Sequence, residues 1–217
     1  MALLVYSGGL DSTVMLYKYA AESRADAAVG INYGQRHIKE LEMARWNCSK
    51  LNIPFFDVDL SSISGIFGDS SLMSKSSSMP EGSYNEAGMK ATVVPNRNMI
   101  MIAVAAARAI SLGCDSVAYA AHGGDHAIYP DCRPDFVKAL AEVLKICDYS
   151  PIRLEAPFLN FSKADIVLEG ARLGVDFSKT WSCYKGGDIH CGKCGTCVER
   201  RQAFASAGVC DPTEYEI

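Results

Sequence analysis

The chain has 217 residues, of which 49% are hydrophobic and 21% charged, so it can bury a sizeable core in one domain, or in one domain with an appendage. Its formal net charge of -4 argues against a surface built for RNA or DNA, since affinity for phosphate backbones comes from clustered Lys and Arg. The sequence opens without a secretory signal, and its longest apolar run falls far short of the roughly 20 residues that a bilayer requires. We therefore expect a cytoplasmic protein that acts on a small molecule and binds neither nucleic acid nor membrane directly.

A strand, a glycine turn and a helix are predicted at the start of the chain. Residues 2–6 form a short apolar run, as a strand buried on both faces should, and apolar residues recur at helical spacing beyond Leu10. Between the two, Gly8 and Gly9 allow backbone conformations that a Cβ would forbid, so that successive N–H groups can converge at the helix N-terminus. The turn is therefore a predicted anion site.

The polar side chains of this turn suggest a phosphate bound together with a cation. Ser7, Ser12 and Thr13 supply neutral donors, whereas Asp11 is unusually acidic for a phosphate site. A carboxylate is explained here if it holds Mg²⁺, which neutralises the phosphates. The segment lacks the G-x-x-x-x-G-K-[ST] pattern and is not a Walker loop. The alternative is an ordinary Gly-Gly turn with a polar helix cap.

Two further strands are predicted at residues 27–32 and 55–60, with an amphipathic helix from Ile38 to Leu51 between them. Such β-α units build parallel sheets with right-handed crossovers, and ligands bind beyond the carboxyl ends of the strands. The loop after the second strand is thus expected to share a rim with the first turn. Its Arg36 and His37 are candidate contacts for nucleotide or substrate.

A long irregular segment follows at residues 61–92, rich in serine and glycine, and we expect a lid or substrate loop rather than a linker. The next run, from Met99 to Ala107, carries no charge, which predicts a helix buried all round at the centre of the fold. Asn96 or Asn98 is expected to cap this helix.

The α/β pattern then continues to about residue 178. A strand at 115–121 leads into a polar loop at the same rim, followed by an amphipathic helix at 136–147 and a weak strand at 153–156. Ser162 is a predicted cap for one more helix. We expect residues 1–178 to form the α/β domain.

Four cysteines near the C-terminus have the spacing of a metal site, with seven, two and two residues between them: Cys183, Cys191, Cys194 and Cys197. Four thiolates can form a closed tetrahedral site, for which structural Zn²⁺ fits best. An iron–sulfur cluster is the main alternative. We expect residues 179–217 to be a zinc-binding segment packed on the α/β domain.

The other cysteines outside the polar loop are expected to be small buried hydrophobic residues. They are Cys48, Cys114, Cys147 and Cys210.

The first turn, Ser7-Gly8-Gly9-Leu10-Asp11-Ser12-Thr13, resembles the S-G-G-x-D-S loop of the PP-loop ATP pyrophosphatases. This resemblance implies a Rossmann-like α/β fold of the adenine nucleotide alpha hydrolase type, with ATP and Mg²⁺ as cofactors. It also implies that the loop grips the β- and γ-phosphates, which leave as pyrophosphate while AMP activates the substrate. The predicted nucleotide-binding residues are Ser7, Gly8, Gly9, Leu10, Asp11, Ser12, Thr13, Arg36 and His37.

Further motifs resemble the 7-cyano-7-deazaguanine synthase family along nearly the whole chain. They are Tyr33-Gly34-Gln35-Arg36-His37, Pro95-Asn96-Arg97-Asn98, Tyr129-Pro130-Asp131-Cys132-Arg133, and Trp181-Ser182-Cys183 with the three later cysteines. The resemblance implies ATP-dependent conversion of 7-carboxy-7-deazaguanine and ammonia into 7-cyano-7-deazaguanine, in queuosine-type biosynthesis, by a homodimer. It implies two adenylation steps with an amide between them.

Roles for single residues follow from this chemistry. The catalytic candidates are Asp11, which holds Mg²⁺, and Arg97 and Lys163, which stabilise charge on the transferring phosphate; surface ion pairs are the alternative for both cations. The substrate-binding candidates are Asp125, Tyr129, Asp131 and Arg133. Among them, Asp131 and Arg133 are the best pair, because a carboxylate suits the N–H donors of a deazaguanine edge and a guanidinium suits the carboxylate of the substrate.

Two other functions remain open on the sequence. A tRNA sulfur transferase would share the adenylating loop and the cysteines, although the acidic balance argues against an RNA surface. A non-catalytic nucleotide-binding module held together by zinc is the other, and the intact loop with Asp11 argues against it.

Overall fold

The computed structural model describes residues 1–68, 70–73, 81–82, 92–124 and 129–216. Its centre is a parallel five-stranded sheet in the order β3-β2-β1-β4-β5. The strands are β1 (Ala2–Val5), β2 (Ala25–Asn32), β3 (Phe55–Asp59), β4 (Ser116–Ala118) and β5 (Arg153–Glu155). All five lie where the apolar runs predict them, and the α/β parallel-sheet fold is confirmed.

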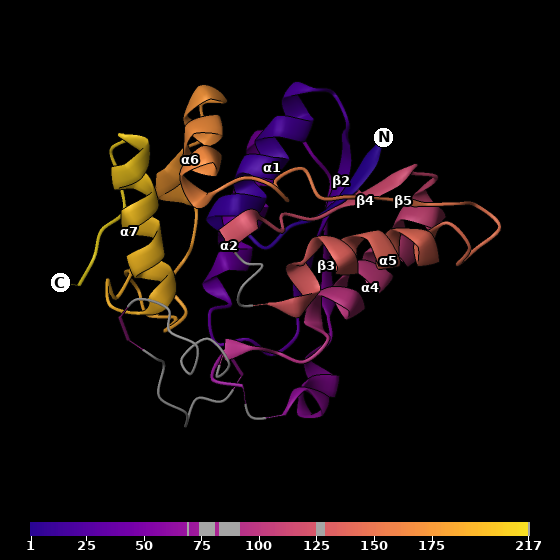
Figure 1. The fold of residues 1–217 in the computed structure, drawn as a ribbon, viewed down its shortest axis with the longest axis horizontal. Coiled ribbons are helices and arrows are strands. Elements are labelled where there is room, and N and C mark those ends of the chain that lie inside the picture. The colour runs from indigo at the N-terminus through magenta and orange to yellow at the C-terminus, as the bar shows by residue number, and fades with distance from the viewer. Residues whose placement is uncertain (69, 74–80, 83–91, 125–128, 217) are drawn as a thin grey trace.

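Helices cover both faces of this sheet (Figure 1). They are α1 (Leu10–Ala21), α2 (Lys39–Lys50), α4 (Arg97–Leu112), α5 (Pro134–Leu144), α6 (Lys163–Arg172) and α7 (Gly195–Ala207), with short 3-10 helices at Ser61–Phe67, Pro130–Cys132 and Phe177–Lys179. In β1, Leu4 packs toward α1, α2, α6 and α7, while Leu3 packs toward α4 and α5. Both side chains are fully buried, which is why the strand reads as an unbroken apolar run.

Helix α4 is not buried all round, so that prediction is wrong. Ile102, Ala105 and Ala109 face the sheet, but Met99 is 42% exposed and Leu112 41%. The helix packs against one face of the sheet, so its opposite side meets solvent. Many of its uncharged residues are alanines, and an uncharged residue need not be buried. Asn96 does occupy the N-cap position, but its side chain makes no cap hydrogen bond.

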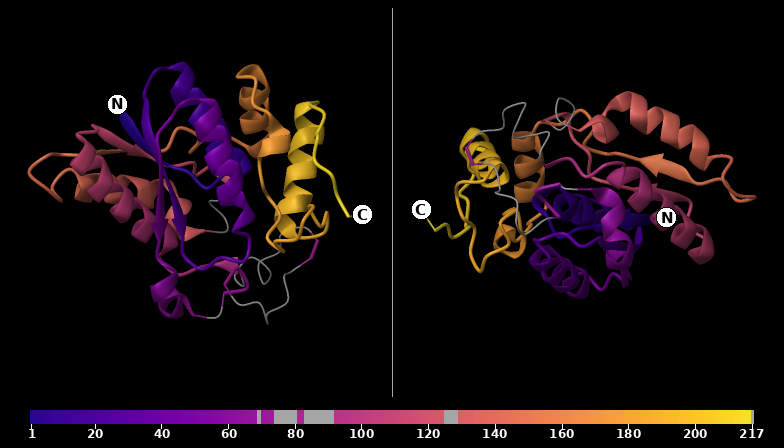
Figure 2. Two further views of the ribbon diagram at one scale, coloured as in Figure 1. Left: turned by 180° about the vertical axis from the view of Figure 1, so that it is seen from behind. Right: turned by 90° about the horizontal axis from the view of Figure 1, so that it is seen from below.

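Helix α6 starts as predicted. Ser162 accepts from the backbone N–H of Asp165, whose side chain accepts in turn from the N–H of Ser162, a complete capping box. Helix α7 was not predicted, because it begins at Gly195, between two of the clustered cysteines. It packs along α6, and the two lie side by side in each view (Figure 2).

The structure describes only part of the predicted lid at residues 61–92. In the predicted lid, residues 61–67 form a 3-10 helix whose Phe67 is buried, whereas residues 69, 74–80 and 83–91 lie outside the described residues.

Cys48 and Cys114 are buried as expected, but Cys147 and Cys210 are exposed, because they lie in the loops that follow α5 and α7. No described helix combines the length and the apolar character needed to cross a bilayer.

Candidate functional site

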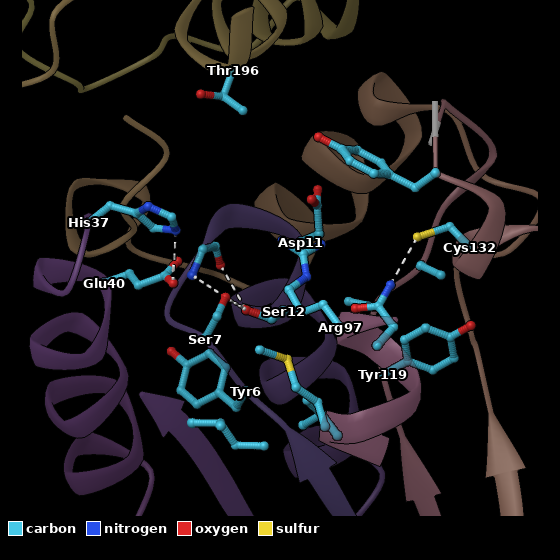
Figure 3. Close-up of a pocket in the computed structure, with 18 of the residues that line it drawn as sticks. Tyr6, Ser7, Asp11, Ser12, His37, Glu40, Arg97, Tyr119, Cys132 and Thr196 are labelled. Carbon is cyan, nitrogen blue, oxygen red and sulfur yellow. Dashed lines mark hydrogen bonds and ion pairs between the residues drawn. The ribbon is translucent and has the colours of Figure 1, made fainter. Parts of the chain in front are cut away.

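A cavity of about 220 Å³ opens at the carboxyl ends of β1, β2 and β4 (Figure 3). Its wall includes Ser7 and Gly9 after β1, Tyr33 after β2, and Tyr119 after β4. Adjacent parallel strands end at one edge, so these segments meet although they are far apart in the sequence. The rim predicted from the order of strands and loops is therefore the place where the cavity forms.

The glycine turn after β1 has the form of an anion site. Gly9 is the N-cap of α1 and supplies no side-chain cap, so the first N–H groups of the helix face the cavity end of the turn. The Ser7 hydroxyl accepts from Gly9 N–H at 3.1 Å and lies 3.1 Å from the Ser12 hydroxyl. Thr13 is fully buried and donates to the Gly9 carbonyl at 2.8 Å. The hydroxyls thus hold the turn in shape, and those of Ser7 and Ser12 also line the cavity.

Gly8 is required by a close approach between this turn and α2. Its φ of 90° belongs to the left-handed region, and an added Cβ would lie 1.9 Å from the carbonyl oxygen of Glu40. No side chain fits there, so the turn can rest directly on the first turn of α2.

Asp11 stands in a group of charged and polar side chains at the cavity. Lys163 Nζ donates to Asp11 Oδ2 at 2.7 Å and lies 3.4 Å from Glu199 Oε2, and the buried His122 places Nε2 3.8 Å from the same Asp11 oxygen. Burial by itself raises the pKa of Asp11, but Lys163 and His122 lower it by more, so the pKa lies below its usual value. The carboxylate therefore stays charged at neutral pH.

The second oxygen of Asp11 fits a cation ligand. Oδ1 is buried and has no hydrogen-bond partner among the residues that the structure describes. An ionised carboxylate oxygen left without a donor is costly, and Mg²⁺ takes oxygen ligands of this kind. The residues present thus fit the Mg²⁺ that the sequence analysis expects.

Arg97, the first residue of α4, enters the cavity among aromatic rings. Its guanidinium lies 5.8 Å from the ring centre of Tyr129, and both residues line the cavity with Tyr33 and Tyr184. Burial lowers the pKa of Arg97, but Tyr33, Tyr184, Tyr129 and Asp131 raise it by more, so its cationic form is favoured. This part of the cavity can receive a flat ring that carries an anionic group.

The structure places other predicted site residues away from the cavity wall. Arg36 donates to the Ser71 carbonyl at 3.4 Å, and Arg133 is exposed at the start of α5. Asp131 accepts from the backbone N–H of Asn98 at 3.1 Å, so its carboxylate caps α4 in place of Asn96. Asp125 lies outside the described residues. Gly8, Leu10 and Thr13 belong to the glycine turn without lining the cavity.

Two charged residues of the cavity wall, Glu40 and Glu199, were not among the predicted site residues, and neither was His122, which is buried against the wall residue Asp11. His122 opens the polar loop that the strand at 115–121 placed at this rim, but no role was predicted for it there. Glu40 lies on the helix after the second strand. Glu199 lies on α7, which was not predicted, and no local signal pointed to it.

The four clustered cysteines form a second site. All four are buried, and their sulfur atoms lie within 4.8 Å of one another, so they can bind a metal. The Cys191 and Cys194 backbone N–H groups donate to the sulfurs of Cys183 and Cys191, at 3.4 and 3.3 Å. Close by in the chain, the N–H of Trp181 donates to the Gly8 carbonyl at 3.0 Å. The cysteine segment is therefore joined directly to the glycine turn.

The parallel sheet covered by helices on both faces, with its glycine turn after the first strand and a C-terminal cysteine cluster, defines an α/β protein with the fold that the PP-loop resemblance implied. The chain belongs to the family described as queuosine biosynthesis protein QueC, whose model matches residues 1–208.

Curated relatives match the chain along its whole length. It is 50% identical over 216 residues to the 7-cyano-7-deazaguanine synthase of Caldicellulosiruptor bescii, covering 100% of this chain and 97% of the relative. It is 48% identical over 215 residues to the protein of that name from Methanoregula boonei, covering 99% of both chains.

Solved structures share the fold at low identity. The U34-tRNA thiolase NcsA from Methanococcus maripaludis, solved with its 4Fe-4S cluster, aligns with a TM-score of 0.54 at 16% identity, covering 99% of this chain and 74% of its own. The NMN synthetase from Francisella tularensis aligns with a TM-score of 0.50 at 14% identity, covering 87% of this chain and 68% of its own.

Proposed function

We propose that the protein converts 7-carboxy-7-deazaguanine and ammonia into 7-cyano-7-deazaguanine at the expense of ATP. The observation that carries the proposal is the identity of about one half to curated synthases over the full chain. A cavity with a phosphate-type turn, a partly buried carboxylate and two cations supports it. The nucleotide would be held at the N-terminus of α1 by Ser7, Gly9 and Ser12, with Asp11 as the Mg²⁺ ligand. Mg²⁺ would neutralise the phosphate charge there.

The chemistry requires a leaving group, because a carboxylate does not exchange oxygen for nitrogen unaided. The substrate carboxylate attacks the α-phosphorus of ATP, pyrophosphate departs, and ammonia then displaces AMP to give an amide. Adenylation of the amide oxygen and loss of AMP leave the nitrile. Lys163 and Arg97 would stabilise the developing phosphate charge. Tyr129 would contact the deazaguanine ring, whereas contacts from Asp125, Asp131, Arg133 and Arg36 stay predictions.

The test is to incubate the protein with ATP, Mg²⁺, ammonium and 7-carboxy-7-deazaguanine, and to follow the nucleotides together with the mass of the base. AMP, pyrophosphate and the nitrile mass are expected, with the primary amide as a competent intermediate. Turnover to AMP without nitrile would point to another acceptor. Binding of bulk tRNA at physiological salt would favour a thiolase, and absence of base-dependent turnover would favour a nucleotide-binding module.

The proposal extends to zinc at the cysteine cluster. In tetrahedral Zn²⁺ sites with Zn–S bonds of about 2.3 Å, the sulfurs lie roughly 4 Å apart. The cysteine sulfurs are within 4.8 Å of one another, which suits one shared ion better than a cluster whose ligands each bind a different iron. Metal analysis should find one zinc per chain and no visible charge-transfer absorption. Iron with acid-labile sulfide would contradict this assignment.

We further propose a homodimer in the cytoplasm, and a zinc-binding segment, 179–217, on the α/β domain 1–178. The exposed apolar side chains of α4 support association, and none of the nine cysteines, all of them described, forms a disulfide, as in reducing compartments. Light scattering coupled to size-exclusion chromatography should give twice the chain mass. A monomer mass at working concentration would contradict the dimer.

A further inference from the structure

His37 and Glu40 form a buried pair at the edge of the cavity. The imidazole is 4% exposed, and its Nε2 lies 3.3 Å from Glu40 Oε1, the contact drawn as a dashed line in Figure 3. A carboxylate can only accept a hydrogen bond. The proton of this contact is therefore carried by Nε2, which leaves the lone pair of the neutral ring on Nδ1.

The second ring nitrogen is a base without a partner. His37 Nδ1 is buried, and nothing in the described part of the chain donates a hydrogen bond to it. The ring is held by Tyr184, whose own ring lies 5.1 Å away between centres. A buried acceptor without a donor is unfavourable, so such an atom calls for an explanation. A donor brought by the substrate would supply one.

The pair adjoins the glycine turn. Both residues line the cavity, and a Cβ on Gly9 would lie 4.0 Å from Glu40 Oε2. Because the turn rests on the start of α2, any movement of the turn relative to the His37–Glu40 pair is restricted. The His37–Glu40 pair is therefore held at the wall of the cavity whose glycine turn is proposed to bind the nucleotide.

We propose that His37 is the general base for the nitrogen chemistry, with Glu40 as the residue that positions it, an inference that rests on the proposed function. In the first half, ammonia nitrogen bonds to the acyl carbon, AMP leaves with the electrons of the C–O bond, and one N–H proton passes to His37 Nδ1. In the second half, the amide oxygen bonds to the α-phosphorus as pyrophosphate leaves, and one N–H proton is lost. Elimination of AMP with the last N–H proton completes the nitrile. An imidazole base oriented by a carboxylate in this way is an established arrangement for proton transfer.

The experiment separates the carboxylate adenylation, which loses no N–H proton, from the nitrogen steps, which do. The variants are His37→Gln, which keeps a donor for Glu40, and Glu40→Gln, with Glu42→Gln on the exposed side of α2 as the matched control. Each is assayed for carboxylate-dependent ATP–pyrophosphate exchange, for amide formation from ammonium, and for hydroxamate formation from hydroxylamine, which is largely neutral at pH 7.

We expect His37→Gln to slow amide formation and hydroxamate formation alike, by about 10²- to 10⁴-fold, with exchange within a few-fold of the unaltered protein. Glu40→Gln should give a smaller loss with the same selectivity and an unchanged KM for ATP, and Glu42→Gln none. Equal loss of exchange and amide formation would overturn the proposal and leave His37 as a nucleotide contact. Absence of exchange in the unaltered protein would instead overturn the proposed function. If His37→Gln does not fold, the selectivity of Glu40→Gln decides.

Discussion

At the scale of single residues, the packing of the glycine turn against α2 requires that Gly8 has no Cβ atom. Gly8 has a positive φ and touches the backbone of α2, whereas Gly113 has a similar φ, 71°, with nothing near the position of a Cβ. A side chain at Gly113 would therefore meet only backbone strain, whereas a side chain at Gly8 would meet both backbone strain and a steric clash. Asp11 is the other residue on which the site depends, because one of its oxygens is paired and the other is not.

Gly8→Ala is expected to lower the melting temperature strongly and to abolish ATP binding, because the methyl group would force the turn away from Glu40. Gly113→Ala should cost only about 1–2 kcal/mol, the strain of a left-handed alanine, and leave ATP binding intact. Thermal unfolding and calorimetric titration with ATP check both. Equal effects of the two substitutions would show that steric contact with α2 is unimportant.

Asp11→Asn keeps the shape of the side chain but removes the charge. We expect a loss of about 10²- to 10³-fold in turnover, comparable to the loss of one group that stabilises transition-state charge. The Mg²⁺ concentration needed for half-maximal rate should rise. Steady-state rates across a Mg²⁺ titration measure both, and an unchanged Mg²⁺ dependence would argue against Asp11 as the ligand.

At the scale of elements, α7 connects the cysteine cluster to the cavity and is held by a buried arginine. Arg200 is 1% exposed and reaches Asp211, Thr180 and the Phe177 carbonyl, so it joins the helix to segments on either side of it in the sequence. The same helix carries Cys197 and Glu199. Its placement therefore determines where Glu199 meets Lys163.

Arg200→Met should destabilise the fold by about 3–5 kcal/mol, because Asp211 would remain partly buried without its partner. Arg201→Met, one residue further on an exposed side of α7, should cost under about 1 kcal/mol. Urea unfolding of both variants gives the comparison. A loss below 1 kcal/mol for Arg200→Met would mean that the buried pair contributes no net stability.

The same pair predicts a pH dependence. Burial raises the pKa of Asp211, but Arg200 and the Tyr215 hydroxyl lower it by more, so its folded pKa lies below the unfolded value of about 3.9. The resulting stabilisation is complete above the unfolded pKa and is lost as the pH falls through the folded pKa. The stability difference between the unaltered protein and Asp211→Asn should be constant from pH 7 to about 5 and shrink below about 4. Urea midpoints measured across this range test it, and a difference independent of pH would contradict it.

At the scale of the whole molecule, the cysteine cluster and the glycine turn are one connected unit. Cys194 is the N-cap of α7, and Trp181, two residues before Cys183, donates to the glycine turn. Loss of metal is therefore expected to loosen both the end of the molecule where α7 lies and the turn beside the cavity.

Chelation of the metal, or Cys194→Ser, should lower the melting temperature and weaken ATP binding together, since metal binding contributes folding free energy. Cys210→Ser, at an exposed cysteine outside the cluster, is the control and should change neither. Metal content, thermal unfolding and ATP titration provide the readout. ATP affinity that survives complete metal loss would show that the turn is independent of the cluster.

The sequence by itself determined the features that local pattern encodes. Unbroken apolar runs marked the strands because both faces of the sheet are covered by helices. The glycine turn and the cysteine spacing could be recognised because each lies within one short segment of the chain. The tertiary structure decided which face of α4 meets the sheet, that Asp131 caps that helix, that Glu40 and Glu199 reach the cavity wall, and that His122 is buried against Asp11. These depend on packing between segments up to 188 positions apart, as for Asp11 and Glu199 on either side of Lys163, and local periodicity does not carry that information.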